Sequence, residues 1–541
     1  MDERTTPVWE EDSALEVVSE TEQRFERLRR QVGFYLAPLA FAATWALTAK
    51  YLATPGSRLS AVLAGVLVLW MCESIPMPMT AVLGACLCVI MGIADAKTAL
   101  APFADPIIFL FIGSFILGRA MRLHRLDRRF ALAILSLRGV GEHPARLLCV
   151  LGLVTTAISM WVSNTATAAM MLPIALGLLN ALRDVGASSA APRDMRQWPF
   201  ATGTMLMVAY AASIGGIGTP VGSPPNLIGI GLIRQWAGVD INFFQWMAIG
   251  VPLCAVMYLA LFGLLYWLHP AEAAPRRDHR GSAEIPPARA DRMSALQGTE
   301  MMRYLQKERE SLGGWTRGQV NTLIAFGVAV VLWMAPGALA LALGKNHVWV
   351  KWAEAHLPEG IVALLAACLL FALPTNRREG AFTLTWQEAT RIDWGTILLF
   401  GGGMSLGGLM FSTGVADAIG RSVTSLTGAQ SLWGLTAAAI ALGILVSETT
   451  SNTASANMII PVVIALAKAA NVNPVPPALG ACLGASYGFM LPVSTPPNAI
   501  VYGSGLVPIP KMVRAGVIFD LCGFLLIWLG LRALCPLMGW R

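Results

Sequence analysis

Two copies of one polar motif lie inside apolar segments that are far apart in the chain. The first copy is Ser163-Asn164-Thr165-Ala166-Thr167-Ala168, and the second is Ser451-Asn452-Thr453-Ala454-Ser455-Ala456. A paired-proline motif follows each copy, as Gly222-Ser223-Pro224-Pro225-Asn226 in the first half and Ser494-Thr495-Pro496-Pro497-Asn498 in the second. A chain built in this way contains one structural unit twice.

A third match near the start of each copy gives the limits of the repeat. Four residues of the first half correspond, at a constant offset, to four of the second half, namely Phe111, Gly113, Leu117 and Gly118 with Phe400, Gly402, Leu406 and Gly407. The repeated unit therefore covers roughly residues 105–235 and 394–506.

The paired motifs predict interrupted membrane helices. Inside a membrane every backbone polar group needs a partner, and a Pro-Pro pair removes two N–H donors and disfavours helix in the preceding residue. The N-termini of half-helices favour anions, whereas unwound carbonyls and hydroxyls favour Na⁺. Interrupted helices at corresponding positions of two halves are typical of the binding site of a secondary transporter.

The composition indicates a polytopic membrane protein, because 55% of the residues are hydrophobic and only 13% are charged. The residues that give the net charge of +7 lie mainly in loops, where they indicate how the chain is oriented in the membrane. We therefore reject a nucleic-acid partner. The N-terminal segment lacks the apolar core and cleavage site of a signal peptide. The nine cysteines and six histidines show no ligand spacing, which argues against a structural metal site.

Apolar segments and basic loops predict the topology of the first half. Segments of spanning length lie near residues 34–52, 60–75, 79–96 and 107–121. An arginine-rich loop then places the chain in the cytoplasm. Because residues 147–182 have basic loops on both sides, we expect them to form a re-entrant hairpin with Ser-Asn-Thr at its tip. The span 199–236 is broken around residues 222–226, and 245–268 returns to the cytoplasm.

An odd number of predicted spans separates the two hairpins, so the second half is expected to have the opposite orientation in the membrane from the first. Within the long loop that links the halves, residues from about 293 to 312 fit either an amphipathic helix on the membrane surface or a solvated linker. Spans follow near residues 319–343, 359–373 and 394–413. The second hairpin, 431–468, therefore enters from the opposite face, and the broken span 477–506 and one last span complete the chain.

The Ser-Asn-Thr tips and the Ser/Thr-Pro-Pro-Asn breaks resemble those of the divalent anion/sodium symporter (DASS) family of di- and tricarboxylate and sulfate transporters. The resemblance covers nearly the whole chain after residue 34. It implies a homodimer in the bacterial inner membrane, in which each protomer has a scaffold domain and a transport domain that moves as an elevator.

The predicted fold is therefore an all-α polytopic membrane protein with about 11 transmembrane helices and two re-entrant hairpins in inverted repeats. The predicted parts are a cytoplasmic N-terminal segment (1–33), scaffold helices (34–104), the first repeat (105–268, with hairpin 147–182 and broken helix 199–236), a cytoplasmic linker (269–318), further scaffold helices (319–393), the second repeat (394–506, with hairpin 431–468 and broken helix 477–506), and the last helix with the C-terminus (507–541).

The resemblance also implies two Na⁺ sites made of neutral oxygens. The first consists of Ser159, Ser163, Asn164 and Gly222, and the second of Ser447, Thr450, Asn452 and Ser494. The substrate is expected between the tips, where neutral donors and helix N-termini hold two carboxylates and bound Na⁺ offsets their charge. Its expected contacts are Ser163, Asn164, Thr165, Ser223, Ser451, Asn452, Thr453, Thr495 and Pro496.

The leading function is Na⁺-coupled import of C4-dicarboxylates such as succinate, malate or fumarate. By resemblance, the Thr in each tip favours a carboxylate over sulfate. A Na⁺-independent dicarboxylate exchanger and a sulfate or citrate transporter of the same fold stay open as alternatives. A cation/proton antiporter needs a carboxylate at the helix breaks, and neither break has one. The motifs of an intramembrane protease are absent, so we expect no enzyme. Paired hairpins of opposite orientation fit alternating access better than a channel.

Glu448, which lies just before the second tip, has two interpretations of equal weight. An acidic side chain inside a membrane is costly and is by default a functional candidate. It also fits a structural carboxylate that accepts hydrogen bonds from hairpin backbone.

Overall fold

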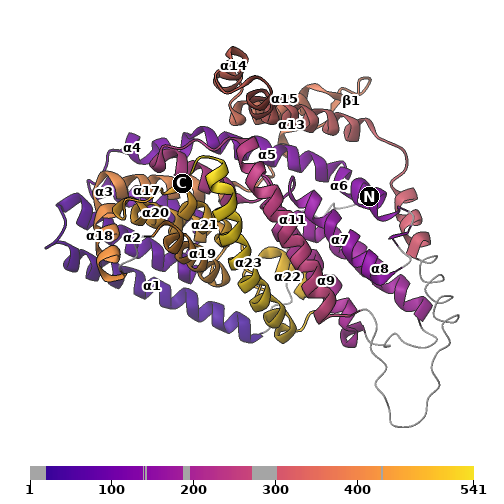
Figure 1. Cartoon of the computed structure of the whole chain (residues 1–541), viewed down its shortest axis with the longest axis horizontal. Coiled ribbons are helices and arrows are strands. Elements are labelled where there is room, and N and C mark those ends of the chain that lie inside the picture. The colour runs from indigo at the N-terminus through magenta and orange to yellow at the C-terminus, as the bar shows by residue number, and fades with distance from the viewer. Residues whose placement is uncertain are drawn as a thin grey trace, which may run out of the picture.

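The computed structural model describes residues 20–137, 139–140, 143–186, 195–270, 301–427 and 431–540. This part of the chain is almost entirely helical (Figure 1). The first half contains α1 (Glu20–Thr48), α2 (Thr54–Cys72), α3 (Met77–Ile90), α4 (Ala96–Leu100), α5 (Pro106–Leu123), α6 (Leu126–Leu135), α7 (Pro144–Ser159), α8 (Asn164–Gly186), α9 (Pro199–Gly215), α10 (Pro224–Leu232) and α11 (Phe243–Leu268).

The second half has the same kinds of element and one small sheet. Its helices are α13 (Arg317–Leu343), α14 (Val348–His356), α15 (Glu359–Ala372), α16 (Trp386–Ala389), α17 (Trp394–Ser412), α18 (Val415–Thr427), α19 (Leu432–Thr449), α20 (Asn452–Ala469), α21 (Val475–Ala485), α22 (Pro496–Gly503) and α23 (Ile509–Leu537). Strands β1 (Pro374–Asn376) and β2 (Ala381–Phe382) pair antiparallel. Short helical turns cover Ala101–Ala104, Met195–Gln197 and Ile233–Ala237.

In the described part, nine helices are long and apolar enough to cross a membrane, or ten if α14 and α15, bent by 64°, form one span. This confirms a multi-pass helical membrane protein. Length and composition alone do not separate spans from hairpin arms, because α8, α19 and α20 pass the test while α3, with 14 residues, does not. The count of about 11 spans plus two hairpins therefore stays a prediction.

The repeat seen in the sequence continues element by element in the structure. Helices α5 to α10 correspond in order to α17 to α22. The short helices α6 and α18 each follow a residue with left-handed backbone, Arg125 (φ 53°) and Gly414 (φ 78°), so the chain turns at the same place in both copies.

The breaks in the two long apolar segments lie slightly earlier than expected. The helix is interrupted over residues 216–223 and 486–495, and each Pro-Pro pair begins the following half-helix, α10 or α22, instead of ending the previous one. Proline suits the first helical positions, because its missing N–H has no partner there in any helix and its fixed φ is already helical.

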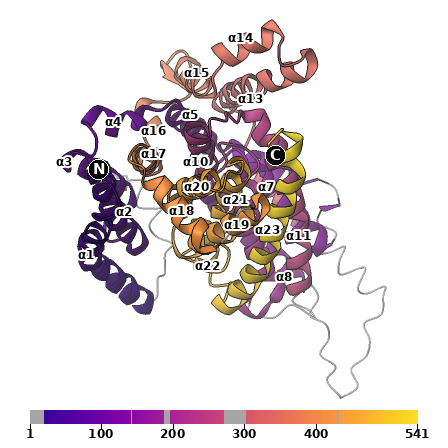
Figure 2. The same ribbon diagram turned by 60° about the vertical axis from the view of Figure 1, so that its left-hand side comes forward.

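The two repeats interlock around the hairpins. Helix α7 packs along α9 and α19 packs along α21, so each hairpin lies on its own broken segment. In addition, α8 contacts α22 and α20 contacts α10, which ties each hairpin to the half-helix of the other repeat. Helices α1 and α2 pack together outside this group, and α13 to α15 lie on another side of it (Figures 1 and 2).

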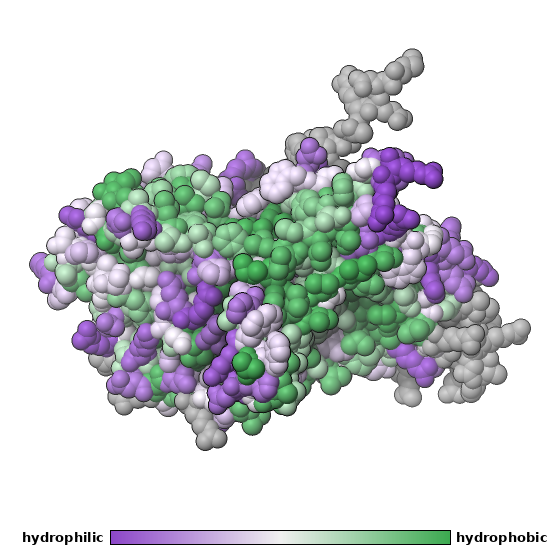
Figure 3. Space-filling view, turned by 90° about the horizontal axis from the view of Figure 1, so that it is seen from above, coloured by the Kyte–Doolittle hydropathy of each residue, from purple (hydrophilic) through white to green (hydrophobic). Residues whose placement is uncertain are grey.

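Apolar side chains cover broad areas of the surface. Figure 3 shows them gathered on the face seen from above, the side on which α13 to α15 lie in Figure 1. On α13 and α15 the exposed side chains include Leu323, Ile324, Val331, Ile361 and Leu365. Apolar surface of this extent suits contact with lipid.

Residues 301–311 of the linker form a helix, as the first of the two interpretations expected, whereas the position of this helix on the membrane surface stays a prediction. Leu305 is buried, and Glu308 pairs with Arg128 of α6. Tyr304 occupies the space beside Gly177 of α8, where a Cβ atom would overlap its ring. The linker helix therefore lies against α6 and α8, and residues 293–300 of the predicted segment lie outside the described residues.

Candidate functional site

The first tip and the first break are joined by one buried hydroxyl. Helix α7 ends at Ser159, the chain turns over residues 160–163, and α8 begins at Asn164. The Ser159 Oγ lies 2.8 Å from Asn164 Oδ1 and 2.6 Å from the carbonyl oxygen of Ala212 at the end of α9, and its one proton is donated to one of these two oxygens. Ser163 caps α8 by accepting from the N–H of Ala166 at 3.3 Å. The end of α7, the turn that follows it and the end of α9 therefore bring several neutral oxygens together.

Gly222 closes this oxygen cluster from the side of the break. A Cβ atom at Gly222 would lie 2.6 Å from the carbonyl oxygen of Gly216 and 2.9 Å from that of Met160. The hydroxyl of Thr219 also donates to the Met160 carbonyl. Only glycine allows the backbone to approach these oxygens so closely.

The second tip repeats this arrangement. Helix α19 ends at Thr449 and α20 begins at Asn452. The Ser447 Oγ lies 2.7 Å from Asn452 Oδ1 and 2.8 Å from the carbonyl oxygen of Ala485 at the end of α21, and its one proton is again donated to one of these two oxygens. Ser451 caps α20 through the N–H of Ala454 at 3.3 Å. The structure therefore brings Ser447 and Asn452 together as it does Ser159 and Asn164.

Two other predicted cation ligands of the second site have protein partners. The Thr450 hydroxyl lies 2.9 Å from both the Val446 carbonyl and the Ser455 hydroxyl, and its residue is 4% exposed. Ser494 donates to the Glu448 carboxylate at 2.6 Å. A hydroxyl that donates one hydrogen bond still has lone pairs for a cation, so these contacts are compatible with ligation.

Glu448 holds the backbone of the second break. Its carboxylate accepts from the N–H of Phe489 (2.6 Å) and from the N–H of Met490 (3.0 and 3.2 Å), besides the Ser494 hydroxyl. Glu448 is 4% exposed. The position that corresponds to it in the first repeat is Met160. The structure thus supports the structural interpretation of this carboxylate, because it satisfies the N–H groups that the missing helix leaves free.

A pair of asparagines fixes the shape of both breaks, and neither of them is among the residues predicted for the site. Asn226 Nδ2 donates to the carbonyls of Gly216 (2.7 Å) and Thr219 (2.8 Å). Asn498 Nδ2 donates to those of Gly488 and Leu491, both at 3.0 Å. The signal was present in the sequence, since each Pro-Pro pair is followed by Asn.

The residues predicted to bind Na⁺ or substrate form two layers, one buried and one more accessible. Ser159 and Ser447 are 0% exposed, and Gly222, Thr450 and Ser494 are buried as well. The substrate set is more accessible, because Ser163, Thr165 and Pro496 are exposed and Asn164, Ser451, Asn452 and Thr453 are partly exposed, whereas Ser223 and Thr495 are buried. Thr495 caps α22 through Asn498 N at 3.4 Å, while the Ser223 side chain makes no cap bond to α10.

The two tip asparagines connect the layers. In each, Oδ1 is turned to a buried serine hydroxyl, so the amide NH₂ group is available to a ligand on the accessible side. One side chain can therefore offer oxygen to a cation and N–H to an anion at the same time.

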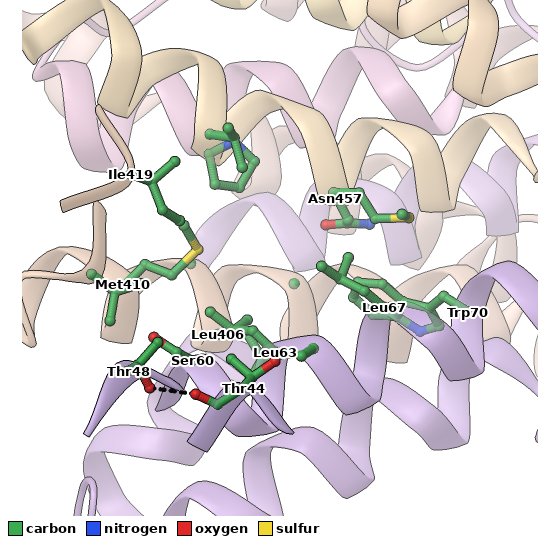
Figure 4. A pocket seen from close by; sticks show the side chains of 17 residues that line it. Thr44, Thr48, Ser60, Leu63, Leu67, Trp70, Leu406, Met410, Ile419 and Asn457 are labelled. Carbon is green, nitrogen blue, oxygen red and sulfur yellow. Dashed lines mark hydrogen bonds between the residues drawn. The ribbon is translucent and has the colours of Figure 1, made fainter. Parts of the chain in front are cut away.

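The cavity drawn in Figure 4 lies away from this site. It has a volume of about 310 Å³ between α1, α2, α17, α18 and α20. Its lining is mostly apolar, with Asn457 at its edge, and it includes none of the predicted site residues described above. An apolar cavity does not compensate the desolvation of a dianion, so we do not assign the substrate to it.

Comparisons with known proteins agree with one another. Residues 32–540 match the family model described as the sodium:sulfate symporter transmembrane region. A sodium-dependent dicarboxylate transporter SdcS of Staphylococcus saprophyticus is 32% identical over 508 residues, covering 93% of this chain and 91% of that protein. SdcS of Staphylococcus aureus (strain USA300) is 30% identical over 510 residues, with coverage of 94% and 91%.

A more distant similarity is seen in the fold alone. The solved structure of the YdaH transporter of Alcanivorax borkumensis aligns with a TM-score of 0.53 at 12% identity, covering 90% of this chain and 99% of that one.

Proposed function

The chain belongs to the divalent anion/sodium symporter family, and from this premise we propose that it imports C4-dicarboxylates such as succinate, malate or fumarate together with Na⁺. The observation that carries the proposal is the double use of Asn164 and Asn452, which face a buried oxygen cluster on one side and accessible space on the other. The names of the SdcS relatives support both the Na⁺ and the dicarboxylate.

Na⁺ would lie on the buried side of each tip. The first position would take oxygens from Ser159, Ser163, Asn164 and the backbone at Gly222, and the second from Ser447, Thr450, Asn452 and Ser494. Neutral oxygens of hydroxyls, amides and unwound carbonyls are the donors expected for Na⁺ in transporters with broken helices. Among the described residues, no group of three His, Cys, Asp or Glu forms a site for a metal that prefers those ligands.

The dicarboxylate would lie in the accessible layer between the tips. The N-termini of α8 and α20 carry the positive ends of their helix dipoles, and the amides and threonine hydroxyls of both tips are neutral donors. Bound Na⁺ beneath each tip offsets the substrate charge and fixes the asparagine orientation. Substrate therefore binds well only when Na⁺ is present, which is the basis of coupling.

We further propose an elevator mechanism in a homodimer of the bacterial inner membrane. The hairpins, the broken segments and α11 and α23 would move as the transport domain, against a scaffold that includes α1, α2, α13 and α15. The interlocked contacts of α8 with α22 and of α20 with α10 support movement as one body.

Uptake of labelled succinate into proteoliposomes tests this function. With an inward Na⁺ gradient we expect uptake at least about tenfold faster than with K⁺ in place of Na⁺, because cation and substrate share the tip residues. Unlabelled citrate and sulfate serve as competitors. Succinate exchange that persists at full rate without Na⁺ would favour the exchanger, and transport of sulfate or citrate without succinate would contradict the substrate assignment.

Substituting Gly222 tests the first cation position separately. In Gly222→Ala, the new methyl group would meet the carbonyls of Gly216 and Met160 and displace them. We expect the Na⁺ concentration for half-maximal uptake to rise by about tenfold or more, with less change in the succinate KM at saturating Na⁺. The matched control is Gly263→Ala on α11, where a Cβ atom meets nothing within 4 Å. Equal Na⁺ dependence in both variants would refute the assignment of Gly222.

A further inference from the structure

The cavity drawn in Figure 4 contains a buried polar atom that has no partner. Asn457 of α20 lines this cavity and is 4% exposed. Its Nδ2 donates to the Thr453 carbonyl at 3.0 Å, whereas its Oδ1 accepts from no donor among the described residues. Exchanging the two ends of the amide would set two oxygens against each other, so Oδ1 is the end that lacks a partner.

The backbone around Asn457 adds a second acceptor at the same place. Oδ1 lies over Gly403 of α17, where a Cβ atom would overlap it, and Gly403 also lines the cavity. Pro461, another lining residue, lies four positions after Asn457 and has no N–H, so the Asn457 carbonyl lacks its usual helical donor. An acceptor without a partner is costly inside a membrane, and this edge of the cavity therefore favours a ligand that donates.

The fold of a hairpin does not explain the amide. At the offset that relates the two tips, Pro461 corresponds to Pro173 in the first hairpin, whereas Asn457 corresponds to Ala169. The repeat thus contains the proline twice and the asparagine once. We infer that the amide of Asn457 serves the cavity beside the second hairpin and not the hairpin itself.

The remaining lining determines which chemistry fits the cavity. None of the described residues that line it is charged, so it suits a neutral molecule. Thr48 and Ser60 line it from α1 and α2, and their hydroxyls donate to the carbonyls of Thr44 (2.7 Å) and Gly56 (2.9 Å) within their own helices. Toward the cavity these two hydroxyls offer only lone pairs. A ligand that satisfies the polar atoms must again be a donor.

The volume of about 310 Å³ indicates the size of the ligand. An apolar cavity of about 150 Å³ holds one benzene molecule, so this one has room for about ten to twelve heavy atoms. Water needs two to four polar partners and takes about 30 Å³ per molecule, so it does not fill a space whose walls are mainly apolar. The apolar lining includes Leu63, Leu67, Leu406 and Met410.

The cavity lies between parts of the molecule that the proposed mechanism moves relative to each other. Helices α1 and α2 belong to the proposed scaffold, whereas α20 begins at the tip residue Asn452. The cavity is not sealed, because Thr44, Leu63 and Met458 are each partly exposed. A molecule dissolved in the bilayer therefore has a way in.

We propose that this cavity binds a neutral apolar molecule of about ten to twelve heavy atoms that carries one hydroxyl group, such as a medium-chain alcohol. Its hydroxyl donates to Asn457 Oδ1, and its chain contacts α2 and α17. The bound molecule bridges α20 to α1 and α2, so it slows the movement of the second hairpin. The site goes beyond the proposed function, because its ligand is neither Na⁺ nor a dicarboxylate, and binding does not depend on transport.

Photolabelling of the purified full chain in detergent micelles tests the binding. The probe is a diazirine derivative of 1-decanol, and mass spectrometry of the peptides locates the label. We expect saturable labelling of lining residues such as Leu63 and Met458. Unlabelled 1-decanol should compete about threefold better than undecane, which has the same number of heavy atoms but no donor. In Asn457→Leu, whose side chain has a similar size, this preference should disappear.

A second pair of variants keeps the test independent of Asn457. Ala64→Leu extends a side chain of α2 into the cavity, and we expect it to abolish the labelling of the lining residues. Ala46→Leu is the matched control, because Ala46 is an exposed residue of α1 that does not line the cavity. It should keep wild-type labelling. If Asn457→Leu does not fold, this pair and the competition between 1-decanol and undecane decide the proposal.

Two outcomes of the labelling would overturn the proposal. Absence of saturable labelling at the lining residues would mean that the cavity holds no such ligand. Undecane that competes as well as 1-decanol, with no change in Asn457→Leu, would assign the cavity to a hydrocarbon chain without a donor, such as the acyl chain of a lipid.

Succinate uptake tests the bridging of α20 to α1 and α2. We expect 1-decanol to lower the maximal rate by about threefold or more in wild type with little change in KM, and to have much less effect in Ala64→Leu. Equal inhibition of both would mean that the alcohol acts through the bilayer, which would refute the bridging. If the protein does not transport succinate, the photolabelling still decides whether the site exists.

Discussion

Replacing either tip asparagine with alanine is expected to lower Na⁺-dependent succinate uptake by about 100-fold or more, which corresponds to about 2.7 kcal/mol. Each substitution removes the oxygen that faces Ser159 or Ser447 and the amide N–H that would donate to a carboxylate. Hydrogen bonds to charged groups are worth about 1.5–3 kcal/mol each, so losing both functions of one side chain has a large effect.

The measurement is initial uptake by Asn164→Ala and Asn452→Ala over a range of Na⁺ concentrations. Asn376→Ala, in the small β1–β2 hairpin, provides a control for the loss of an amide away from the tips. Both tip variants should stay folded, with Tm values within a few degrees of wild type. Uptake that stays within about twofold of wild type in either variant would show that this tip does not bind both ligands.

The second large effect is expected at Glu448. Glu448→Ala leaves the N–H groups of Phe489 and Met490 without an acceptor in a buried place, at a cost of about 1–3 kcal/mol for each group. We expect the variant to lose nearly all uptake and to unfold at a clearly lower temperature, because the break loses the contacts that fix Ser494.

Glu448→Gln separates the roles of shape and charge. Its amide oxygen still accepts from the break but carries no charge, so uptake is expected to recover in part, to between the values of Glu448→Ala and wild type. Glu354→Gln on the exposed face of α14 controls for the loss of an acidic residue. If Glu448→Ala transports at the wild-type rate and unfolds at the wild-type temperature, this carboxylate does not hold the break.

The sequence by itself determined the membrane class, the family and the positions of the two tips. These features depend on local chemistry, because Ser-Asn-Thr begins a helix with its own capping serine and Pro-Pro begins a half-helix without needing N–H partners. The doubling of both motifs made the pattern specific. The family resemblance grouped Ser159 with Asn164 and Ser447 with Asn452, and the structure brings each of these pairs into contact.

The tertiary structure decided which distant groups satisfy the broken backbone. Glu448 reaches amides about 40 residues later in the chain, and no local pattern separates that role from a direct role in the site. Hydrogen bonds within one helix turn follow from the order of residues, whereas the partners of an unwound segment depend on which helices the fold places beside it.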